Sequence, residues 1–237
     1  MDIAKVPAAL LAGGLATRLR PITQTIPKAM VEVAGRPFID HQLSLLRHNG
    51  IRSIVLCLGY LGDQIEQYLG SGARHGLQLQ YSHDGDRLLG TGGALRRALS
   101  LLGEAFWVIY GDSYMDIDYR SVLAHFRAGQ ARGLMTVFHN ENRFDTSNVV
   151  FRKGRLMCYS KRATTPEMRH IDYGVTLLCR DVLASLPENE PADLADLLSD
   201  MADRGELIGH EVTRRFYEIG SHRGLEETQH YLRALCA

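Results

Sequence analysis

The sequence predicts an α/β fold, in which a mainly parallel sheet is covered by helices on both faces. Through the first half of the chain, short apolar runs alternate with segments of helical periodicity. Strands that are apolar throughout are typical of parallel sheets buried on both faces. The pattern changes after Asn148, where a hairpin and longer strands follow. We therefore expect a parallel core with added mixed strands in the second half, as a single domain over residues 1–237.

In the first half, each strand-like run is followed by a helical pattern. The first helical pattern ends at Asn49-Gly50, which is a common C-terminal stop signal. The strands are expected at 6–12, 53–59, 77–82 and 106–113. The helices are expected at 36–50, 61–72 and 91–103.

In the second half, the predicted strands outnumber the predicted helices. A hairpin over 149–160 is expected to turn at Lys153-Gly154. The other strands are expected at 133–139, 170–179, 207–212 and 215–219. The helices are expected near 121–129, 181–186 and 191–204, with a final one from about Gly224.

The composition is that of an ordinary globular protein, with 45% hydrophobic and 23% charged residues. The 27 Lys and Arg equal the 27 Asp and Glu, which argues against a nucleic-acid-binding surface but allows a local basic pocket. No apolar run approaches the roughly 18–20 residues of a membrane span, and the start lacks the charge pattern of a signal peptide. We therefore expect a cytoplasmic protein without membrane partners. The four cysteines form no CxxC pair, which argues against structural zinc.

A glycine-rich loop with basic residues follows the first predicted strand. In LLAGGLATRLRPITQTIPKAM, residues 10–30, Gly13 and Gly14 end the apolar run. Arg18 and Lys28 follow, and no acidic residue interrupts the stretch. Glycines let backbone N–H groups approach phosphate oxygens, a guanidinium offers a bidentate fork, and a lysine offers a mobile charge. This combination predicts a nucleoside triphosphate site, the alternative being a tight turn followed by exposed basic residues.

Two further loops are expected at the same edge of the sheet. Asp112, in YGDSYMD, follows a strand, and a carboxylate beside a polyphosphate suits Mg²⁺; a plain Gly-Asp-Ser turn is the alternative. LLGTGGAL, residues 88–95, opens a helix with glycines that admit an anion or a flat base, and an N-cap at Thr91 is the alternative. Ligands of open parallel sheets bind at the carboxyl ends of the strands, so these loops should meet the first one there.

These motifs resemble those of the sugar-1-phosphate nucleotidyltransferases. LAGGLATRLRPITQTIPKAMVEVAGRPFIDHQL resembles the family pattern LAGGxGTRLxPxTxxxPKxxxxxxGxPxI, and LGTGGAL, GDSYM and FYEIGSHRGLEE follow in the family's order. The resemblance implies a GT-A-like, Rossmann-related three-layer fold. It also implies a Mg²⁺-dependent reaction, in which a sugar 1-phosphate attacks the α-phosphorus of an NTP to give an NDP-sugar and pyrophosphate. Such transfer needs positioning and charge neutralisation, so none of the ten histidines is expected to be catalytic.

The resemblance also implies which residues form the site. The implied catalytic residues are Arg18, Lys28 and Asp112, and the implied Mg²⁺ ligands are Asp112 and Glu218. The residues implied to bind the nucleotide are Leu11, Ala12, Gly13, Gly14, Thr17, Arg18, Asp84, Gly90, Thr91 and Asp112. The residues implied to bind the sugar phosphate are Lys28, Asn148, Lys161, Asp172, Tyr173 and Gly174.

Three residues depart from the family pattern. Ala16 replaces the usual glycine of GxGTR and adds a methyl group near the phosphates. Glu218 replaces the usual Asp, so a metal ligand there would have to retract or bind differently. Asp172 replaces an Asn that lines the sugar site, and an ionised carboxylate only accepts hydrogen bonds, which suits a hydroxyl-rich sugar.

Within the family, LGTGGAL, DYG and FYEIGS are most similar to the D-glycero-α-D-manno-heptose 1-phosphate guanylyltransferases, which make GDP-heptose for bacterial capsule or S-layer glycans. This similarity implies GTP and that heptose 1-phosphate as substrates. Asp84 or Asp86 could accept hydrogen bonds from guanine N1–H and N2–H₂, with a solvated turn as the alternative. The QPxxxGLAxA pattern of thymidylyl and uridylyl relatives is absent, which disfavours dTTP and UTP.

Other functions stay open. The sugar could be mannose, glucose or N-acetylmuramic acid 1-phosphate, or the chain could be a non-catalytic regulatory subunit that binds an NTP or NDP-sugar. An NAD-dependent enzyme is disfavoured, because the dinucleotide fingerprint GxGxxG is missing. The oligomeric state is not predicted, and a homo-oligomer is compatible with the sequence.

Overall fold

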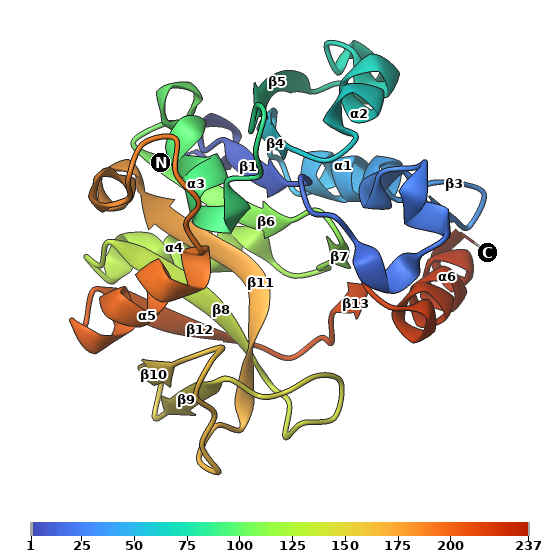
Figure 1. Ribbon diagram of the computed structural model, residues 1–237. Helices are drawn as coiled ribbons and strands as arrows, with labels where there is room; N and C mark the ends of the chain where they lie inside the picture. The colour runs from blue at the N-terminus through green and yellow to red at the C-terminus, as the bar shows by residue number, and fades with distance from the viewer. Residues whose placement is uncertain (1, 237) are drawn as a thin grey trace.

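The structure is a computed structural model that describes residues 2–236 and is built around a nine-stranded mixed sheet (Figure 1). The strands follow the order β10-β9-β11-β6-β1-β4-β5, and β8 pairs with both β11 and β12. Their bounds are β1 (Ala8–Leu11), β4 (Ser53–Leu58), β5 (Gln78–His83), β6 (Ala105–Tyr110), β8 (Gly133–His139), β9 (Val149–Arg152), β10 (Arg155–Tyr159), β11 (His170–Cys179) and β12 (Leu207–Val212).

Helices and two small antiparallel strand pairs complete the described chain. The α-helices are α1 (Phe38–His48), α2 (Gly62–Leu69), α3 (Gly90–Arg97), α4 (Tyr119–Ala128), α5 (Leu194–Asp203) and α6 (His222–Cys236). The small pairs are β2 (Glu32–Val33) with β3 (Arg36–Pro37), and β7 (Ser113–Tyr114) with β13 (Tyr217–Glu218). The 3₁₀ helices are η1 (Ile3–Lys5), η2 (Thr17–Leu19), η3 (Ile22–Gln24), η4 (Lys28–Met30), η5 (Ala73–His75), η6 (Leu99–Leu101) and η7 (Arg180–Ser185).

The strands β5, β4, β1 and β6 form a parallel core, in which Leu10 of β1 pairs with Leu56 on one side and Ile109 on the other. The strand β11 runs antiparallel to both β6 and β8, and β12 runs parallel to β8. A parallel core extended by mixed strands is the arrangement expected from the sequence, and the α/β prediction is confirmed.

Alternate residues of the central strands point to opposite faces of the sheet and build two hydrophobic clusters. Leu10 and Trp107 point to the face covered by α1, α2 and α4, whereas Ala9 and Val108 point to the face covered by α3 and α5. Because both faces are covered, the edge at the carboxyl ends of the parallel strands is left for ligands.

The longest helix described is α6, with 15 residues. Spanning a bilayer takes about 20 consecutive apolar residues. Among residues 2–236, no helix combines the length and the hydrophobicity that a membrane span needs.

Several boundaries differ from the predicted ones for local reasons. The helix expected from residue 191 begins at Leu194, because the Asp193 side chain caps it by accepting a hydrogen bond from Ala195 N at 3.0 Å. The helix expected over 91–103 is divided at Ala98 into α3 and η6. The segment expected at 181–186 is a 3₁₀ helix, and β13 has only two residues.

The N-terminus of α3 packs closely against the chain that leads into α5. Gly92 N and Gly93 N donate to Ala192 O at 2.8 and 3.2 Å. A Cβ added to Gly93 would lie 2.5 Å from Glu190 O, so only glycine permits this approach of two backbones. The glycines of this motif therefore have a packing role as well as any role towards a ligand.

We expect Gly93→Ala to lower the free energy of unfolding by about 1–3 kcal/mol, because the new methyl group forces the two backbones apart. This loss would come despite the better helix propensity of alanine, which favours it by about 1 kcal/mol. Urea denaturation measures the change, and Gly103→Ala is the matched control, because its Cβ would make ordinary contacts from 3.4 Å. Unchanged stability in Gly93→Ala would contradict the packing role.

Candidate functional site

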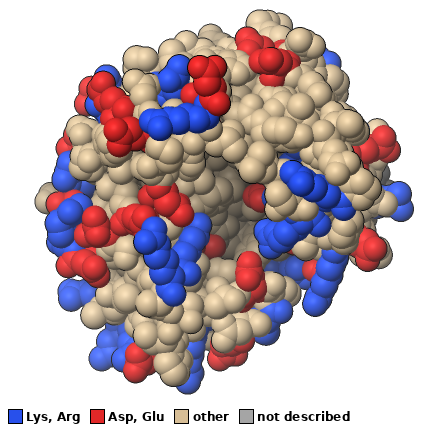
Figure 2. Space-filling view, in the orientation of Figure 1, with Lys and Arg blue, Asp and Glu red and all other residues tan. Residues whose placement is uncertain are grey.

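The carboxyl ends of β1, β4 and β6 border a pocket of about 260 Å³. Figure 2 shows this face of the molecule hollowed at its centre, with Lys and Arg side chains on both sides of the hollow. The predicted site residues that line the pocket are Leu11, Ala12, Gly13, Gly14, Lys28, Asp84, Gly90, Thr91 and Asp112. The structure therefore brings the three predicted loops together at one edge of the sheet.

The first loop is shaped by Gly13, Gly14 and Ala16. A Cβ on Gly13 would lie 2.7 Å from Gly59 N, whereas a Cβ on Gly14 would meet nothing within 4 Å. Ala16 keeps the left-handed backbone expected of glycine, with φ of 49°, which costs an L-residue about 1–2 kcal/mol. Its carbonyl accepts a hydrogen bond from the Thr23 hydroxyl at 2.7 Å. The methyl group is thus accommodated without loss of the glycine-type turn.

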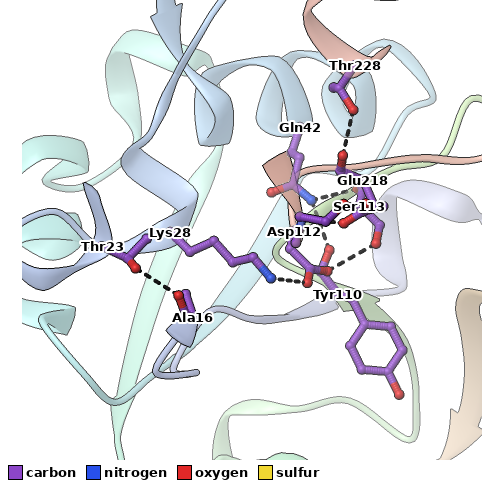
Figure 3. A network of polar contacts seen from close by, with 11 residues as sticks. Ala16, Thr23, Lys28, Gln42, Tyr110, Asp112, Ser113, Glu218 and Thr228 are labelled. Atoms are coloured by element: carbon purple, nitrogen blue, oxygen red, sulfur yellow. Dashed lines mark hydrogen bonds and ion pairs between the residues drawn. The ribbon is translucent and has the colours of Figure 1, made fainter. Parts of the chain in front are cut away.

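Lys28 and Asp112, which both line the pocket, form an ion pair with 2.5 Å between Nζ and Oδ2 (Figure 3). The Ser113 hydroxyl donates to Asp112 Oδ1 at 3.0 Å. Burial alone would raise the pKa of Asp112, but the charge and hydrogen bond of Lys28, with the Ser113 hydroxyl, outweigh it, so the pKa is lowered. Gln42 of α1 fixes this turn by donating to Tyr110 O at 2.9 Å and Ser113 O at 2.8 Å.

Arg18 approaches the same place from η2. Its Nη2 and the Nζ of Lys28 each lie 3.1 Å from the position that a Cβ on Gly220 would occupy. Gly220 therefore leaves the space in which two cations converge beside Asp112. Thr17 is exposed on η2 and is not part of the pocket lining.

Asp84 and the start of α3 also line the pocket. Asp84 is only 7% exposed, its Oδ2 accepts a hydrogen bond from Leu89 N at 3.0 Å, and burial raises its pKa. Asp86 is exposed and does not line the pocket. Gly90 has φ of 69°, and its Cβ would lie 2.7 Å from Ala192 O.

Thr91 does not cap α3, because the helix already begins at Gly90. Its hydroxyl instead donates to Asp193 Oδ1 at 2.9 Å and accepts from Leu194 N at 2.8 Å. The N–H groups of Gly92 and Gly93 are bonded to Ala192 O, so the start of α3 has fewer free donors for an anion than its sequence suggested.

Lys161 and Asp172 lie beside Tyr110, which lines the pocket. Lys161 Nζ donates to the Tyr110 hydroxyl at 3.4 Å. Burial opposes the charge of Lys161, but Tyr110 and Asp172 favour it and raise its pKa to about 12. Asp172 accepts hydrogen bonds from Gly174 N at 3.0 Å and from the Tyr159 hydroxyl at 3.4 Å, and its burial raises its pKa.

Of the residues predicted to bind the sugar phosphate, only Lys28 is part of the pocket lining. The side chain of Tyr173, which is 2% exposed, packs against Phe138 and Phe216 and donates to Arg215 O at 3.3 Å. It follows Asp172 on β11 and therefore points to the other face of the sheet. Asn148 is buried, and its side-chain oxygen accepts the backbone N–H of Asp172 at 2.9 Å.

Gly174 and Asp193 complete this side of the site. Gly174 has φ of 96°, and its missing Cβ leaves room for the ring of Tyr110, whose Cδ2 would lie 3.3 Å away. Asp193 was not predicted as a site residue, yet its charge acts on both Lys161 and Tyr110. An Asp before the apolar helix of ADLADLL is a recognisable N-cap, but its nearness to Lys161 depends on the tertiary fold.

The comparison with known protein families agrees with this arrangement. Residues 8–150 match the family described as Nucleotidyl transferase, which is more than half of the chain. The chain belongs to the nucleotidyl transferase family. The matched region contains the three loops that meet at the pocket.

Curated relatives of this nucleotidyl transferase use different nucleotides and sugars. A UTP–glucose-1-phosphate uridylyltransferase of Synechocystis is 28% identical over 215 residues, which cover 84% of this chain and 55% of that protein. An N-acetylmuramate alpha-1-phosphate uridylyltransferase of Neisseria meningitidis is 42% identical over 113 residues, covering 47% of this chain and 49% of that protein. The catalytic subunit beta of a mannose-1-phosphate guanylyltransferase of Drosophila pseudoobscura is 28% identical over 218 residues, which cover 90% of this chain and 58% of that protein. The chain thus spans about half the length of these relatives.

Among solved structures, HddC from Yersinia pseudotuberculosis in complex with GMP-PN superposes with a TM-score of 0.79. It is 21% identical and covers 96% of this chain and 99% of that one. At this identity the similarity establishes the fold alone. The three-layer α/β nucleotidyltransferase fold expected from the sequence is confirmed.

A magnesium ion in this nucleotidyl transferase would find one suitably placed carboxylate, that of Asp112. Among residues 2–236, no three His, Cys, Asp or Glu side chains are grouped closely enough to hold a metal by themselves. Mg²⁺ commonly takes one or two carboxylates and completes its shell with water and substrate phosphates, so Asp112 fits that donor set. Both carboxylate oxygens of Glu218 instead accept hydrogen bonds from the protein, from Gly220 N and the Ser221 hydroxyl.

We expect Lys28→Met to raise the pKa of Asp112 above its ordinary value of 3.8, because burial then acts without a counter-charge. The lowered pKa in the wild type means that the ion pair stabilises the fold above pH 4 and that this contribution is lost as the pH falls through the pKa. The stability difference between wild type and variant should therefore shrink below pH 4.

Carbon-13 NMR titration of the Asp112 carboxyl group and urea denaturation at pH 7 and pH 3 measure these two effects. Lys5→Met, at an exposed lysine, is the control. An Asp112 pKa that is the same in wild type and Lys28→Met would show that the ion pair does not set it.

Proposed function

We propose that the protein transfers a nucleotidyl group from an NTP to a sugar 1-phosphate, releasing pyrophosphate. The observation that carries this proposal is the ion pair of Lys28 and Asp112, which lines the same pocket as the Gly13–Gly14 loop in a nucleotidyl transferase. Membership of the family supports the reaction class, and the gathered charges suit a triphosphate.

The reaction needs little beyond positioning. A phosphate oxygen of the sugar 1-phosphate forms a bond to the α-phosphorus, the bond to the bridging oxygen breaks, and pyrophosphate leaves with the electron pair. Arg18 and Lys28 offset the charge that develops on the phosphate oxygens, and Lys161 holds the sugar phosphate. When bound, Mg²⁺ supplies further neutralisation, with Asp112 as its protein ligand. Lys28 exchanges its contact with Asp112 for one with phosphate.

We propose GTP as the nucleotide. Guanine presents two neighbouring donors, N1–H and N2–H₂, whereas uracil and thymine present one donor between two carbonyl oxygens, which repel a carboxylate. Asp84 lines the pocket beside the first loop, because a Cβ on Gly59 would lie 3.1 Å from Asp84 Oδ2 and 2.7 Å from Gly13 O, whereas Asp86 is exposed and does not line the pocket. The buried carboxylate therefore favours guanine.

We expect Asp84→Asn to lower kcat/KM for GTP about tenfold to a hundredfold, because a hydrogen-bonded charged acceptor is lost. The value for UTP should stay unchanged or rise, since the repulsion of the uracil carbonyl groups is also removed. Steady-state kinetics with both nucleotides measure the ratio, and the exposed Asp86→Asn is the matched control. A GTP-to-UTP ratio that is equal in wild type and Asp84→Asn would contradict this role.

We propose a neutral, hydroxyl-rich sugar, with D-glycero-α-D-manno-heptose 1-phosphate as the specific candidate and GDP-heptose for capsule polysaccharide as the product. Lys161 lies within electrostatic reach of two carboxylates, Asp172 and Asp193. An N-acetylmuramate 1-phosphate carries an additional lactyl carboxylate, which this surplus of negative charge disfavours.

We expect Asp172→Asn, which restores the family's usual residue, to raise kcat/KM for N-acetylmuramate 1-phosphate roughly tenfold relative to mannose 1-phosphate. One like-charge repulsion is then removed from a partly buried site. Pyrophosphate release with the two sugars measures the shift, and Asp200→Asn, at an exposed carboxylate, is the control. An unchanged preference would remove the argument against N-acetylmuramate.

The proposed activity is tested by pyrophosphate release from a grid of NTPs and sugar 1-phosphates with Mg²⁺. Strong preference for GTP with the heptose 1-phosphate would support the specific proposal, and turnover of another pair would replace the substrates while keeping the reaction. NTP binding without turnover of any pair would favour a regulatory subunit.

A further inference from the structure

The turn between β13 and α6, residues 218–221, is closed by the side chain of Glu218. Glu218 Oε1 accepts a hydrogen bond from the Ser221 hydroxyl at 2.7 Å, and Oε2 accepts one from Gly220 N. The carbonyl oxygen of Glu218 accepts a third from the hydroxyl of Thr228, which is fully buried in α6, at 2.7 Å. These bonds tie the carboxylate of Glu218 to the turn before α6 and its carbonyl oxygen to α6 itself.

The carboxylate of Glu218 lies against the first turn of α6. A Cβ on Gly224 would lie 1.7 Å from Glu218 Oε1, so the carboxylate occupies the space that this glycine leaves. The Ser221 hydroxyl accepts a hydrogen bond from Gly224 N at 3.0 Å and thereby caps the helix while donating to Glu218. A negative charge at a helix N-terminus is favourable, because the helix dipole is positive there.

The same turn is attached to the functional site. Glu218 pairs with Ser113 between β13 and β7, and Ile219 N donates to Asp112 O at 2.9 Å. Gly220 lies next to the charged ends of Arg18 and Lys28, because a Cβ on Gly220 would lie 3.1 Å from Arg18 Nη2 and 3.1 Å from Lys28 Nζ. A displacement of residues 218–221 would therefore move the backbone of Asp112 and the space in which both cations converge.

An apolar cluster holds α6 on this edge of the molecule. Ile219 and Leu232 are buried with Phe38 and Tyr114, and the rings of Tyr217 and Tyr231 stack with their centroids 3.9 Å apart. Figure 1 shows α6 beside β13 and β3, away from α3 and α5. The turn at Glu218 is thus the link between this peripheral helix and Asp112.

We propose that Glu218 is a positioning residue that anchors the start of α6 and holds the 218–221 turn against Arg18 and Lys28, and that it does not bind the metal. Its side chain, one methylene longer than that of aspartate, reaches back to Ser221 and Gly220, and both of its carboxylate oxygens already accept hydrogen bonds there. The metal part of this inference rests on the proposed function, and the anchoring part does not.

The test compares how tightly the wild type, Glu218→Gln and Asp112→Asn bind Mn²⁺. Binding is measured by electron paramagnetic resonance in the presence of a non-hydrolysable GTP analogue. Loss of a metal ligand should weaken Mn²⁺ binding at least about tenfold, which we expect for Asp112→Asn. We expect Glu218→Gln to bind Mn²⁺ within about twofold of the wild type. A tenfold loss in Glu218→Gln, without a change in melting temperature, would overturn the proposal.

A second measurement tests the anchor without metal or turnover. We expect Glu218→Ala and Ser221→Ala each to lower the melting temperature by about 2–4 °C, as loss of a helix cap does in a chain of this size. The double variant should lose clearly less than the sum of the two, because each side chain acts through the other. If the melting-temperature losses of the two single variants add fully in the double variant, the anchoring role of Glu218 is overturned. Absence of turnover in the wild type would refute the proposed function. The non-additive effect of Glu218→Ala and Ser221→Ala on the melting temperature would still test the anchor.

Discussion

The ion pair of Lys28 and Asp112 is the interaction on which the rest of the site depends. It joins the loop that follows β1 to the turn that follows β6, two neighbouring strands of the parallel core. The half-buried carboxylate of Asp112 is stabilised in its charged form by a nearby counter-charge, and Lys28 provides it. In the proposed function a triphosphate would attract the same lysine, so this contact would both shape the site and lie where the anion binds.

Close approaches that only glycine permits place the groups around that ion pair. The backbone of Gly13 passes near that of Gly59 and the backbone of Gly93 near that of Glu190, whereas Gly220 lies near the side-chain ends of Arg18 and Lys28. Side chains at these positions would push their neighbours away. The glycines behind the second loop therefore allow tight packing, and those of the first loop would, in the proposed function, leave room for phosphate.

Much of the fold followed from local patterns. Apolar strands such as β4 and β6 and the hairpin at Lys153-Gly154 were located by periodicity and turn residues. The pairing of β7 with β13 was missed, because two-residue strands carry no periodic signal and their pairing joins segments about 100 residues apart. For the same reason the bonds of Glu218 to Ser221 and Gly220 could not be read from the sequence.

The lining of the pocket was predictable where a motif directly follows a strand, as for Gly13 after β1 and Asp112 after β6. It was less predictable where side-chain direction matters. Asp172 and Tyr173 were grouped because both fall in a segment that the family resemblance assigns to the sugar site, yet neighbours on a strand point to opposite faces, and Tyr173 packs in the core. Thr91 was predicted to bind the nucleotide, with a helix cap as the alternative, whereas its hydroxyl joins α3 to Asp193, a contact that only the tertiary structure supplies.

The most direct measurement is a crystal structure with Mg²⁺ and a non-hydrolysable GTP analogue. If the ion pair holds the empty site for a triphosphate, Lys28 Nζ should leave Asp112 and lie within hydrogen-bond distance of a phosphate oxygen. A complex in which Lys28 and Asp112 remain paired while the phosphates bind elsewhere would contradict the role given to this interaction.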